Sequence, residues 1–168
     1  MTKVLFICLG NICRSPMAKF IFADMVRRAG LASQFEIDSA ATSDEEQGNP
    51  LYPPARDILR RNGIACEGHQ ARQMTAADYD HFDLVIAMDE SNLRHLRPFV
   101  SGDPLGKVSL LLDHTPASLA SYHHRGISDP WFTHDFAKAY DDIHTGCSFL
   151  LKELTEQQFE DISPISNH

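Results

Sequence analysis

The 168-residue sequence has no long apolar run and no excess of positive charge. No segment approaches the ~20 consecutive apolar residues that a membrane-spanning helix needs, so we expect no integration into a membrane. Lys and Arg number 15 against 23 Asp and Glu, which leaves a formal net charge of −8. Without a basic stripe to neutralise a phosphate backbone, neither nucleic acid nor an anionic membrane is an expected partner. An anionic ligand must be bound by a local group of donors.

Cysteine is scarce, and nothing marks the chain for export. A chain of this length builds the core of a single domain, residues 1–168, without disulfides, and polar residues interrupt the N-terminal apolar run before any signal cleavage site. We therefore expect a cytoplasmic protein with reduced thiols at Cys8, Cys13, Cys66 and Cys147. We expect no metal and no other cofactor, because paired ligand spacing is missing among His114, His123, His124, His134 and His144.

Short apolar, β-branched runs alternate with helical patterns along the chain. Residues 3–8 have the pattern of a central strand buried on both faces, and further strands are predicted at residues 35–39, 83–88 and 107–112. A helix is predicted to begin with Ser15 as N-cap and Pro16 at the first helical position, and to end at Arg28. Further helices are predicted at residues 55–62, 75–79, 89–96 and 136–156, with loops at 40–54 and 113–130 and a frayed last dozen residues.

This alternation predicts an α/β fold. We expect a small open four-stranded parallel sheet flanked by helices on both faces. Ligands in such sheets bind at the carboxyl ends of the strands, which is where Cys8 lies. The loop between the first strand and the first helix is therefore the expected binding site.

The loop from Cys8 to Ser15 carries the predicted chemistry. Gly10 permits a sharp bend, and the N–H groups that precede the helix form an anion site. Arg14 adds a planar fork of donors that matches two phosphate oxygens. The same donors favour the thiolate of Cys8, which attacks phosphorus to give a phosphocysteine intermediate without a metal ion. The other members of this phosphate loop are Leu9, Asn11, Ile12 and Cys13.

The proton for the leaving oxygen must come from elsewhere, because the loop contains no acid. Asp129 is the predicted general acid, since Pro130 stiffens the chain just after its carboxylate. Trp131 and Phe132 follow directly, and two large aromatic residues in a polar segment suit one wall of an aryl pocket. The expected substrates are phosphotyrosine proteins or small aryl phosphates, with inorganic phosphate as product.

The loop and the distant acid together resemble the low-molecular-weight protein tyrosine phosphatases. The likeness spans nearly the whole chain. It rests on the loop motif of residues 4–16, on Asp129 and Pro130, and on matching segments at residues 38–43, 48–50, 71–73 and 88–93. It implies a four-stranded parallel sheet and hydrolysis of phosphotyrosine.

The resemblance also implies a role for individual residues. It assigns Cys8 as nucleophile, Arg14 as phosphate binder, and Asp129 as general acid and then base. Ser15 would assist the thiolate as it leaves the phosphocysteine. The strained loop would be held by a network of three further side chains, Asn11, Ser39 and His69. Cys13 matches the cysteine that traps an oxidised nucleophile as a reversible disulfide.

Two regions depart from the family pattern. Many relatives carry an aromatic residue on the loop before residues 48–50, where this chain has Glu45 and Glu46. Many also carry tyrosines at the positions of Trp131 and Phe132, so regulation by phosphorylation of those tyrosines is excluded here. The predicted pocket therefore has one aromatic wall, with Glu45 as a further part of its rim. An acidic rim favours a basic or neutral peptide around the phosphate.

Other functions stay open on the same fold. A protein arginine phosphatase is disfavoured by the bulky Ile12, where such relatives carry a smaller polar residue. An arsenate reductase needs additional cysteines in a mobile segment, and the corresponding residues 77–98 contain none. A phosphate-binding or redox-sensing module would keep the loop without turnover, but Cys8, Arg14 and Asp129 are all present.

Overall fold

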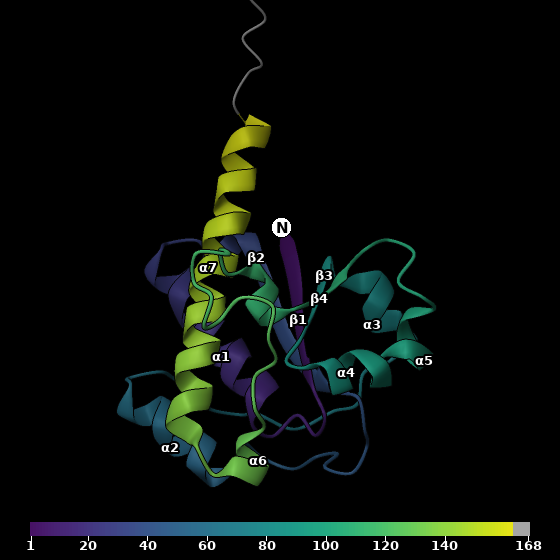
Figure 1. The fold of residues 1–168 in the computed structure, drawn as a ribbon, viewed down its shortest axis with the longest axis vertical. Helices are drawn as coiled ribbons and strands as arrows, with labels where there is room; N and C mark the ends of the chain where they lie inside the picture. Colours follow the sequence, from purple (N-terminus) through teal and green to yellow (C-terminus); the bar gives the residue numbers. More distant parts are fainter. Residues whose placement is uncertain (163–168) are drawn as a thin grey trace, which may run out of the picture.

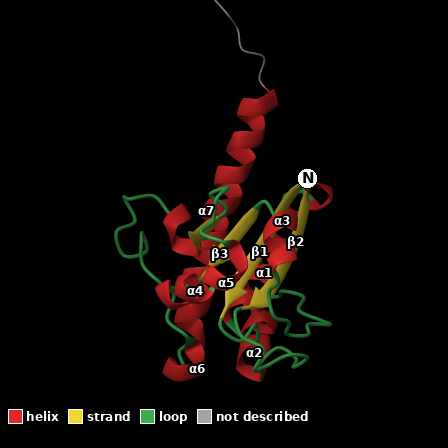
Figure 2. Cartoon of the chain, turned by 90° about the vertical axis from the view of Figure 1, so that its right-hand side faces the viewer, coloured by secondary structure: helices red, strands yellow, loops and turns green. Residues whose placement is uncertain are grey.

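Four parallel strands form the sheet of the computed structural model, which describes residues 1–162, the last five of them by their backbone alone. Their order across the sheet is β2 (Phe35–Ala41), β1 (Thr2–Cys8), β3 (Leu84–Ala87) and β4 (Val108–Leu110). The predicted central place of the first strand is confirmed, because β1 pairs with β2 on one side and with β3 on the other. Figure 2 shows the strands side by side between two layers of helix.

The apolar run of β1 contributes to two cores at once. Successive side chains point to opposite faces of a strand. Val4 and Phe6 pack into the core on one face of the sheet, and Leu5 and Ile7 pack into the core on the other. All four are fully buried. The run therefore lacks polar alternation because neither face of the sheet meets solvent at this strand.

Helices cover both faces, as predicted (Figure 1). One face carries three helices that pack on one another, α1 (Arg14–Arg28), α2 (Pro53–Arg61) and α7 (Phe136–Ile162). The other carries three short helices, α3 (Ala76–His81), α4 (Glu90–His95) and α5 (Arg97–Val100). The remaining elements are η1 (Ala32–Gln34), η2 (Leu111–His114) and α6 (Pro130–Thr133). Within residues 1–162, no helix combines the length and the apolar character needed to cross a membrane.

The predicted start of the first helix is wrong. The helix α1 begins at Arg14, and its N-cap is Cys13, which makes no side-chain capping bond. Ser15 is therefore not the cap but lies in the first turn, and its hydroxyl bonds to the Cys8 sulfur and to the Asn11 amide instead. The sequence shows a good capping residue before a proline, but it does not show that the hydroxyl is used by the loop.

The chain after β4 also differs from the prediction. The predicted fourth strand is shorter, because Leu111–His114 turns into the 3-10 segment η2. The predicted loop ends in α6, where the Asp129 carboxylate accepts a hydrogen bond from the Trp131 N–H and Pro130 takes the first helical position. The helix α7 continues to Ile162, so fraying is not found at residues 157–162. Residues 163–168, also predicted to fray, lie outside the described part of the chain.

The carboxyl ends of β1 and β3 bring distant segments to one edge of the sheet. The strand β1 leads directly into the loop before α1. The segment before α6 is joined to the end of β3, because the N–H of Ile127 donates to the carbonyl of Met88 over 2.8 Å. This bond brings Asp129, two residues further on, to the edge where the Cys8 loop lies.

Candidate active site

Asn11 fixes the shape of the loop between β1 and α1. Its φ of 59° lies in the left-handed region, which asparagine tolerates better than most residues. Its amide nitrogen donates to the Ser15 hydroxyl over 2.8 Å and to the Ser39 hydroxyl over 2.9 Å. Its amide oxygen accepts from the Arg72 N–H over 3.1 Å, and its carbonyl oxygen lies 2.7 Å from His69 Nε2. Asn11, Ser39 and His69, predicted to share a network, do lie together and are buried.

The Cys8 sulfur lies in the bend of this loop and is almost fully buried. The backbone N–H of Asn11 donates to it over 3.3 Å, and the Ser15 hydroxyl lies 2.9 Å away. The Ser15 oxygen already accepts from the Asn11 amide, so its own proton is available to the sulfur or to the Ala40 carbonyl, 3.5 Å away.

Gly10 is needed for close approach rather than for an unusual backbone angle. A Cβ at this position would lie 3.3 Å from Cγ of Glu46, which is tighter than ordinary van der Waals contact. The loop and the segment that carries Glu46 therefore lie close together at this point.

Arg14 is buried at the start of α1 and its guanidinium is held by three oxygens. One terminal nitrogen donates to Asp89 over 2.6 Å and to the Ile127 carbonyl over 2.7 Å, and the other donates to Asp129 over 3.3 Å. Burial alone lowers the pKa of Arg14, but the negative charges of Cys8, Asp129 and Asp89 outweigh it and raise the pKa above its ordinary value. The guanidinium stays charged beside the sulfur.

Asp89 is a site residue that the sequence reasoning missed. From the sequence, Asp89 marks only the start of the helix predicted at residues 89–96. One of its carboxylate oxygens does cap α4, accepting from the Asn92 N–H over 2.8 Å, while the other accepts from Arg14. Its place at the carboxyl end of β3, beside the strand that carries Cys8, is the signal that points to it.

The two carboxylate oxygens of Asp129 likewise have different hydrogen-bond partners. One oxygen caps α6 by accepting from the Trp131 N–H over 3.0 Å, and the other faces Arg14. The side chain keeps 20% of its surface exposed. The structure thus places the predicted acid within reach of the pocket, more than a hundred residues from the loop in sequence.

These residues surround a cavity of about 190 Å³. The predicted loop residues that line it are Cys8, Leu9, Gly10, Ile12, Cys13 and Arg14, and the predicted wall residues are Asp129, Trp131, Phe132 and Glu45. Glu46 lines it as well. The residues Trp131 and Phe132 are 44% and 71% exposed, so this wall is open to solvent.

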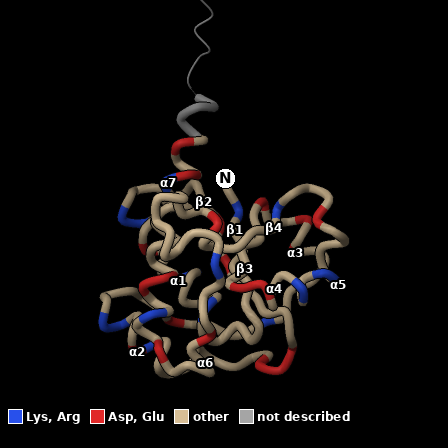
Figure 3. Tube along the Cα trace, viewed as in Figure 1, with Lys and Arg blue, Asp and Glu red and all other residues tan. Residues whose placement is uncertain are grey.

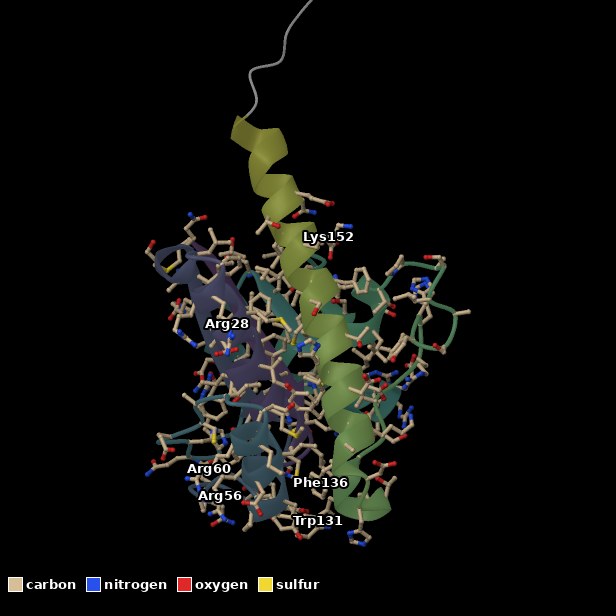
Figure 4. The ribbon with its side chains drawn as sticks, turned by 90° about the vertical axis from the view of Figure 1, so that its left-hand side faces the viewer. Arg28, Arg56, Arg60, Trp131, Phe136 and Lys152 are labelled. Carbon is tan, nitrogen blue, oxygen red and sulfur yellow. The ribbon has the colours of Figure 1, made fainter. Side chains whose placement is uncertain are left out.

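Tyr52 supports the aromatic wall and was also missed. Its ring centroid lies 4.8 Å from that of Trp131 and 6.0 Å from that of Phe136, and its N–H donates to the Ile12 carbonyl. Figure 4 shows Trp131 and Phe136 at the same end of the molecule. An aromatic residue just before two prolines, in an otherwise polar segment, was the available signal.

All four cysteines are free thiols and are buried. Burial, followed by the negative charge of Cys8, raises the pKa of Cys13, so this neighbour stays protonated at neutral pH. A reversible disulfide between Cys8 and Cys13 stays a prediction. Within residues 1–157, no group of three or more His, Cys, Asp or Glu side chains could hold a metal ion.

A cysteine sulfur in an anion-binding loop, beside a buried arginine and a carboxylate, defines the class of cysteine-dependent phosphate-ester hydrolases. Comparison with known proteins gives the family. The family model of the low molecular weight phosphotyrosine protein phosphatases matches residues 3–160. The chain belongs to this family.

Individual relatives match this chain over nearly their full length. The chain is 40% identical to the low molecular weight protein-tyrosine-phosphatase YfkJ of Bacillus subtilis, covering 94% of this chain and 99% of that one. The crystal structure of YfkJ superposes with a TM-score of 0.88 over 94% of this chain and 97% of that one, at 39% identity. The human low molecular weight phosphotyrosine protein phosphatase is 36% identical, covering 90% and 94%. The drosophila arginine phosphatase matches with a TM-score of 0.80 and 30% identity, covering 91% and 98%.

Proposed function

We propose that the chain hydrolyses phosphotyrosine in proteins, or small aryl phosphates, and releases inorganic phosphate. The observation that carries the proposal is the single pocket in which the Cys8 sulfur, the Arg14 guanidinium and the Asp129 carboxylate meet beneath apolar walls. Ile12 and Trp131 line that pocket and suit the flat faces of a phenyl ring. We further propose that residues 1–168 act as one domain in the cytoplasm, where free thiols persist.

The first step forms a bond between the Cys8 sulfur and phosphorus and breaks the bond from phosphorus to the phenolic oxygen. The loop N–H groups and Arg14 stabilise the charge on the phosphoryl oxygens. Asp129, in its protonated form, gives its proton to the leaving phenolate. The product is a phosphocysteine and a free tyrosine side chain.

The second step returns the enzyme to its starting state. Asp129, now ionised, takes a proton from a water molecule that attacks the phosphocysteine. The bond from sulfur to phosphorus breaks, and inorganic phosphate leaves. The Ser15 hydroxyl, 2.9 Å from the sulfur, donates to the departing thiolate.

Substitutions at the two reacting residues test this mechanism. Cys8→Ser is expected to abolish hydrolysis of an aryl phosphate, and Asp129→Ala to slow formation of the phosphocysteine by about 10²- to 10⁴-fold. Asp80→Ala, at an exposed position on α3, is the matched control. Full activity of Cys8→Ser would refute the proposal. A burst of phosphocysteine without steady-state turnover in the unsubstituted protein would instead support a phosphate-binding module.

Phosphoarginine is the alternative substrate with a specific precedent, since the drosophila arginine phosphatase shares the fold. The apolar Ile12 side chain at the pocket favours an aromatic ring over a charged guanidinium. Rates on matched phosphotyrosine and phosphoarginine peptides decide between them, and faster release from phosphoarginine would overturn the preference. Arsenate reduction is expected to show no turnover, because residues 77–98 carry no cysteine to pass on a disulfide.

A further inference from the structure

A second and larger hollow adjoins the catalytic pocket. It has a volume of about 520 Å³, against about 190 Å³ for the pocket itself. The two share Ile12, Glu46 and Trp131, so they lie next to each other with these side chains at the boundary. A peptide whose phosphotyrosine ring enters the pocket can therefore reach the larger hollow with a neighbouring residue.

The larger hollow, here called the α2 groove, combines apolar side chains with two arginines and two carboxylates, those of Glu46 at the boundary and of Glu67. It is lined on its apolar part by Pro50, Leu51, Tyr52 and Pro53. Arg56 and Arg60, one turn apart on α2, line it as well. Figure 4 shows these two arginines near each other at the end of the molecule where Trp131 lies, whereas Arg28 lies farther along the body.

Both arginines are held only weakly by their own neighbours. Arg56 lies 3.4 Å from the Asp57 carboxylate, and Arg60 lies 3.5 Å from that of Glu67. The Glu67 side chain is 80% exposed and the Asp57 side chain 57%. Exposed ion pairs of this kind contribute little to the stability of the fold. Each arginine can therefore exchange its present partner for a better placed carboxylate of a substrate.

The charged side chains at the rim of the catalytic pocket are acidic. Glu45 and Glu46 line this pocket, and of the described Lys and Arg residues only the buried Arg14 lines it. Glu46 at the boundary is already bonded to the Asn49 amide over 2.6 Å. Figure 3 shows basic positions around α2 in a chain that is acidic overall. Exposed arginines therefore line the α2 groove, whereas the charged side chains at the rim of the catalytic pocket are glutamates.

We propose that the α2 groove binds the substrate residues next to phosphotyrosine, and that Arg56 and Arg60 select an acidic side chain there. The inference rests on the proposed phosphotyrosine hydrolysis and deepens it. The bound peptide then has a defined orientation. Its acidic residue lies on the α2 side, and a basic or neutral residue lies on the side of Glu45.

Phosphotyrosine peptides with a single variable residue test this selection. Peptides carry Glu, Ala or Lys at one of the three positions before or after the phosphotyrosine. The readout is kcat/KM for each peptide relative to kcat/KM for a small aryl phosphate, which is too short to reach the groove. We expect Glu at one or more positions on one side to raise this ratio by about five- to tenfold over Ala at low salt, and the gain to shrink as salt rises.

Variants of the groove assign the effect to the two arginines. Arg56→Gln with Arg60→Gln is expected to remove most of the preference for Glu, and Arg60→Glu to shift the preference toward Lys. Arg28→Gln, on the exposed surface of α1, is the matched control and should keep the preference. Thermal unfolding of each variant checks that the fold is intact.

The outcomes separate the two proposals. An unchanged preference in the double variant, an equal loss in Arg28→Gln, or no preference in the unsubstituted protein would each overturn the role of the α2 groove. Absence of aryl phosphate hydrolysis in the unsubstituted protein would instead refute the proposed function.

Discussion

The floor and the rim of the catalytic pocket are built differently. The floor, here Cys8, Asn11, Arg14 and Ser15, is buried and held together by its own hydrogen bonds. Asn11 and Arg14 also form hydrogen bonds of 2.6 to 3.3 Å with strands and loops far away in sequence. The rim, here Glu45, Glu46, Trp131 and Phe132, is partly or largely exposed. In the proposed mechanism the floor carries the chemistry, which tolerates little change in geometry, whereas the rim meets the variable part of the substrate.

The largest effect is expected at the arginine of the floor. Arg14→Lys keeps the charge but loses the planar fork, and it leaves Asp89 and Asp129 without a matched donor. We expect kcat/KM on an aryl phosphate to fall by about 10³-fold, in line with losses of preorganised oxyanion donors. Arg28→Lys on the exposed face of α1 should leave kcat/KM unchanged. A loss below tenfold in Arg14→Lys would show that the fork is not essential.

The second effect compares Asn11 of the floor with Asn49, which bonds to Glu46 of the rim. Asn11→Ala removes the donors to Ser15 and Ser39 and places a Cβ-bearing residue without a polar side chain at a φ of 59°. We expect a loss of about 1–3 kcal/mol in unfolding free energy and a fall in kcat of about 10². Asn49→Ala, which breaks only an exposed bond to Glu46, should change stability by less than about 0.5 kcal/mol.

Asn11→Gly separates the two contributions of this residue. Glycine accepts the positive φ without strain but makes no side-chain bonds. It should recover part of the stability and little of the activity. Recovery of full activity would show that the backbone angle, and not the network, is what the loop requires.

The same division explains what could be predicted from the sequence. The strand that contains residues 3–8, the anion loop and Asp129 could be predicted, because each is marked by local spacing or by a strong propensity. Asp89 and Tyr52 have only indirect signals in the sequence, because their roles depend on β3 and α2 being placed beside the loop. Ser15 was misplaced as a cap for the same reason: the tertiary bond to Cys8 outweighs its local preference.

The rim is expected to respond more weakly. The residue Phe132 is 71% exposed, so Phe132→Ala removes only part of one wall. We expect about a threefold rise in KM for an aryl phosphate with kcat nearly unchanged, because less than ~1 kcal/mol of ring contact is lost. Trp131→Ala should have a larger effect on KM, since Tyr52 packs against that ring. A fall of 10² in kcat for Phe132→Ala would move this residue from the rim to the catalytic machinery.

The smallest expected effect is a dependence of stability on pH that comes from the floor. Burial lowers the pKa of His69 below its ordinary 6.5, and this effect outweighs the hydrogen bond to the Asn11 carbonyl, which raises the pKa. Above pH 6.5 the ring is neutral in both the folded and the unfolded state, so its titration does not lower the free energy of unfolding. As pH falls from 6.5 through the lowered pKa of the folded state, the unfolded chain binds a proton that the folded chain resists, and the free energy of unfolding falls.

His69→Gln keeps a donor for the Asn11 carbonyl and cannot titrate. Its unfolding midpoint should therefore fall less than that of the unsubstituted protein between pH 7.5 and pH 5.5, measured by thermal or urea unfolding. His95→Gln, at an exposed position on α4, should retain the full slope. If the unfolding midpoint changed with pH by the same amount in all three proteins, the titration of His69 would not contribute to the pH dependence. His69 would then behave like a residue at the solvent surface, and not like one buried against the floor of the pocket.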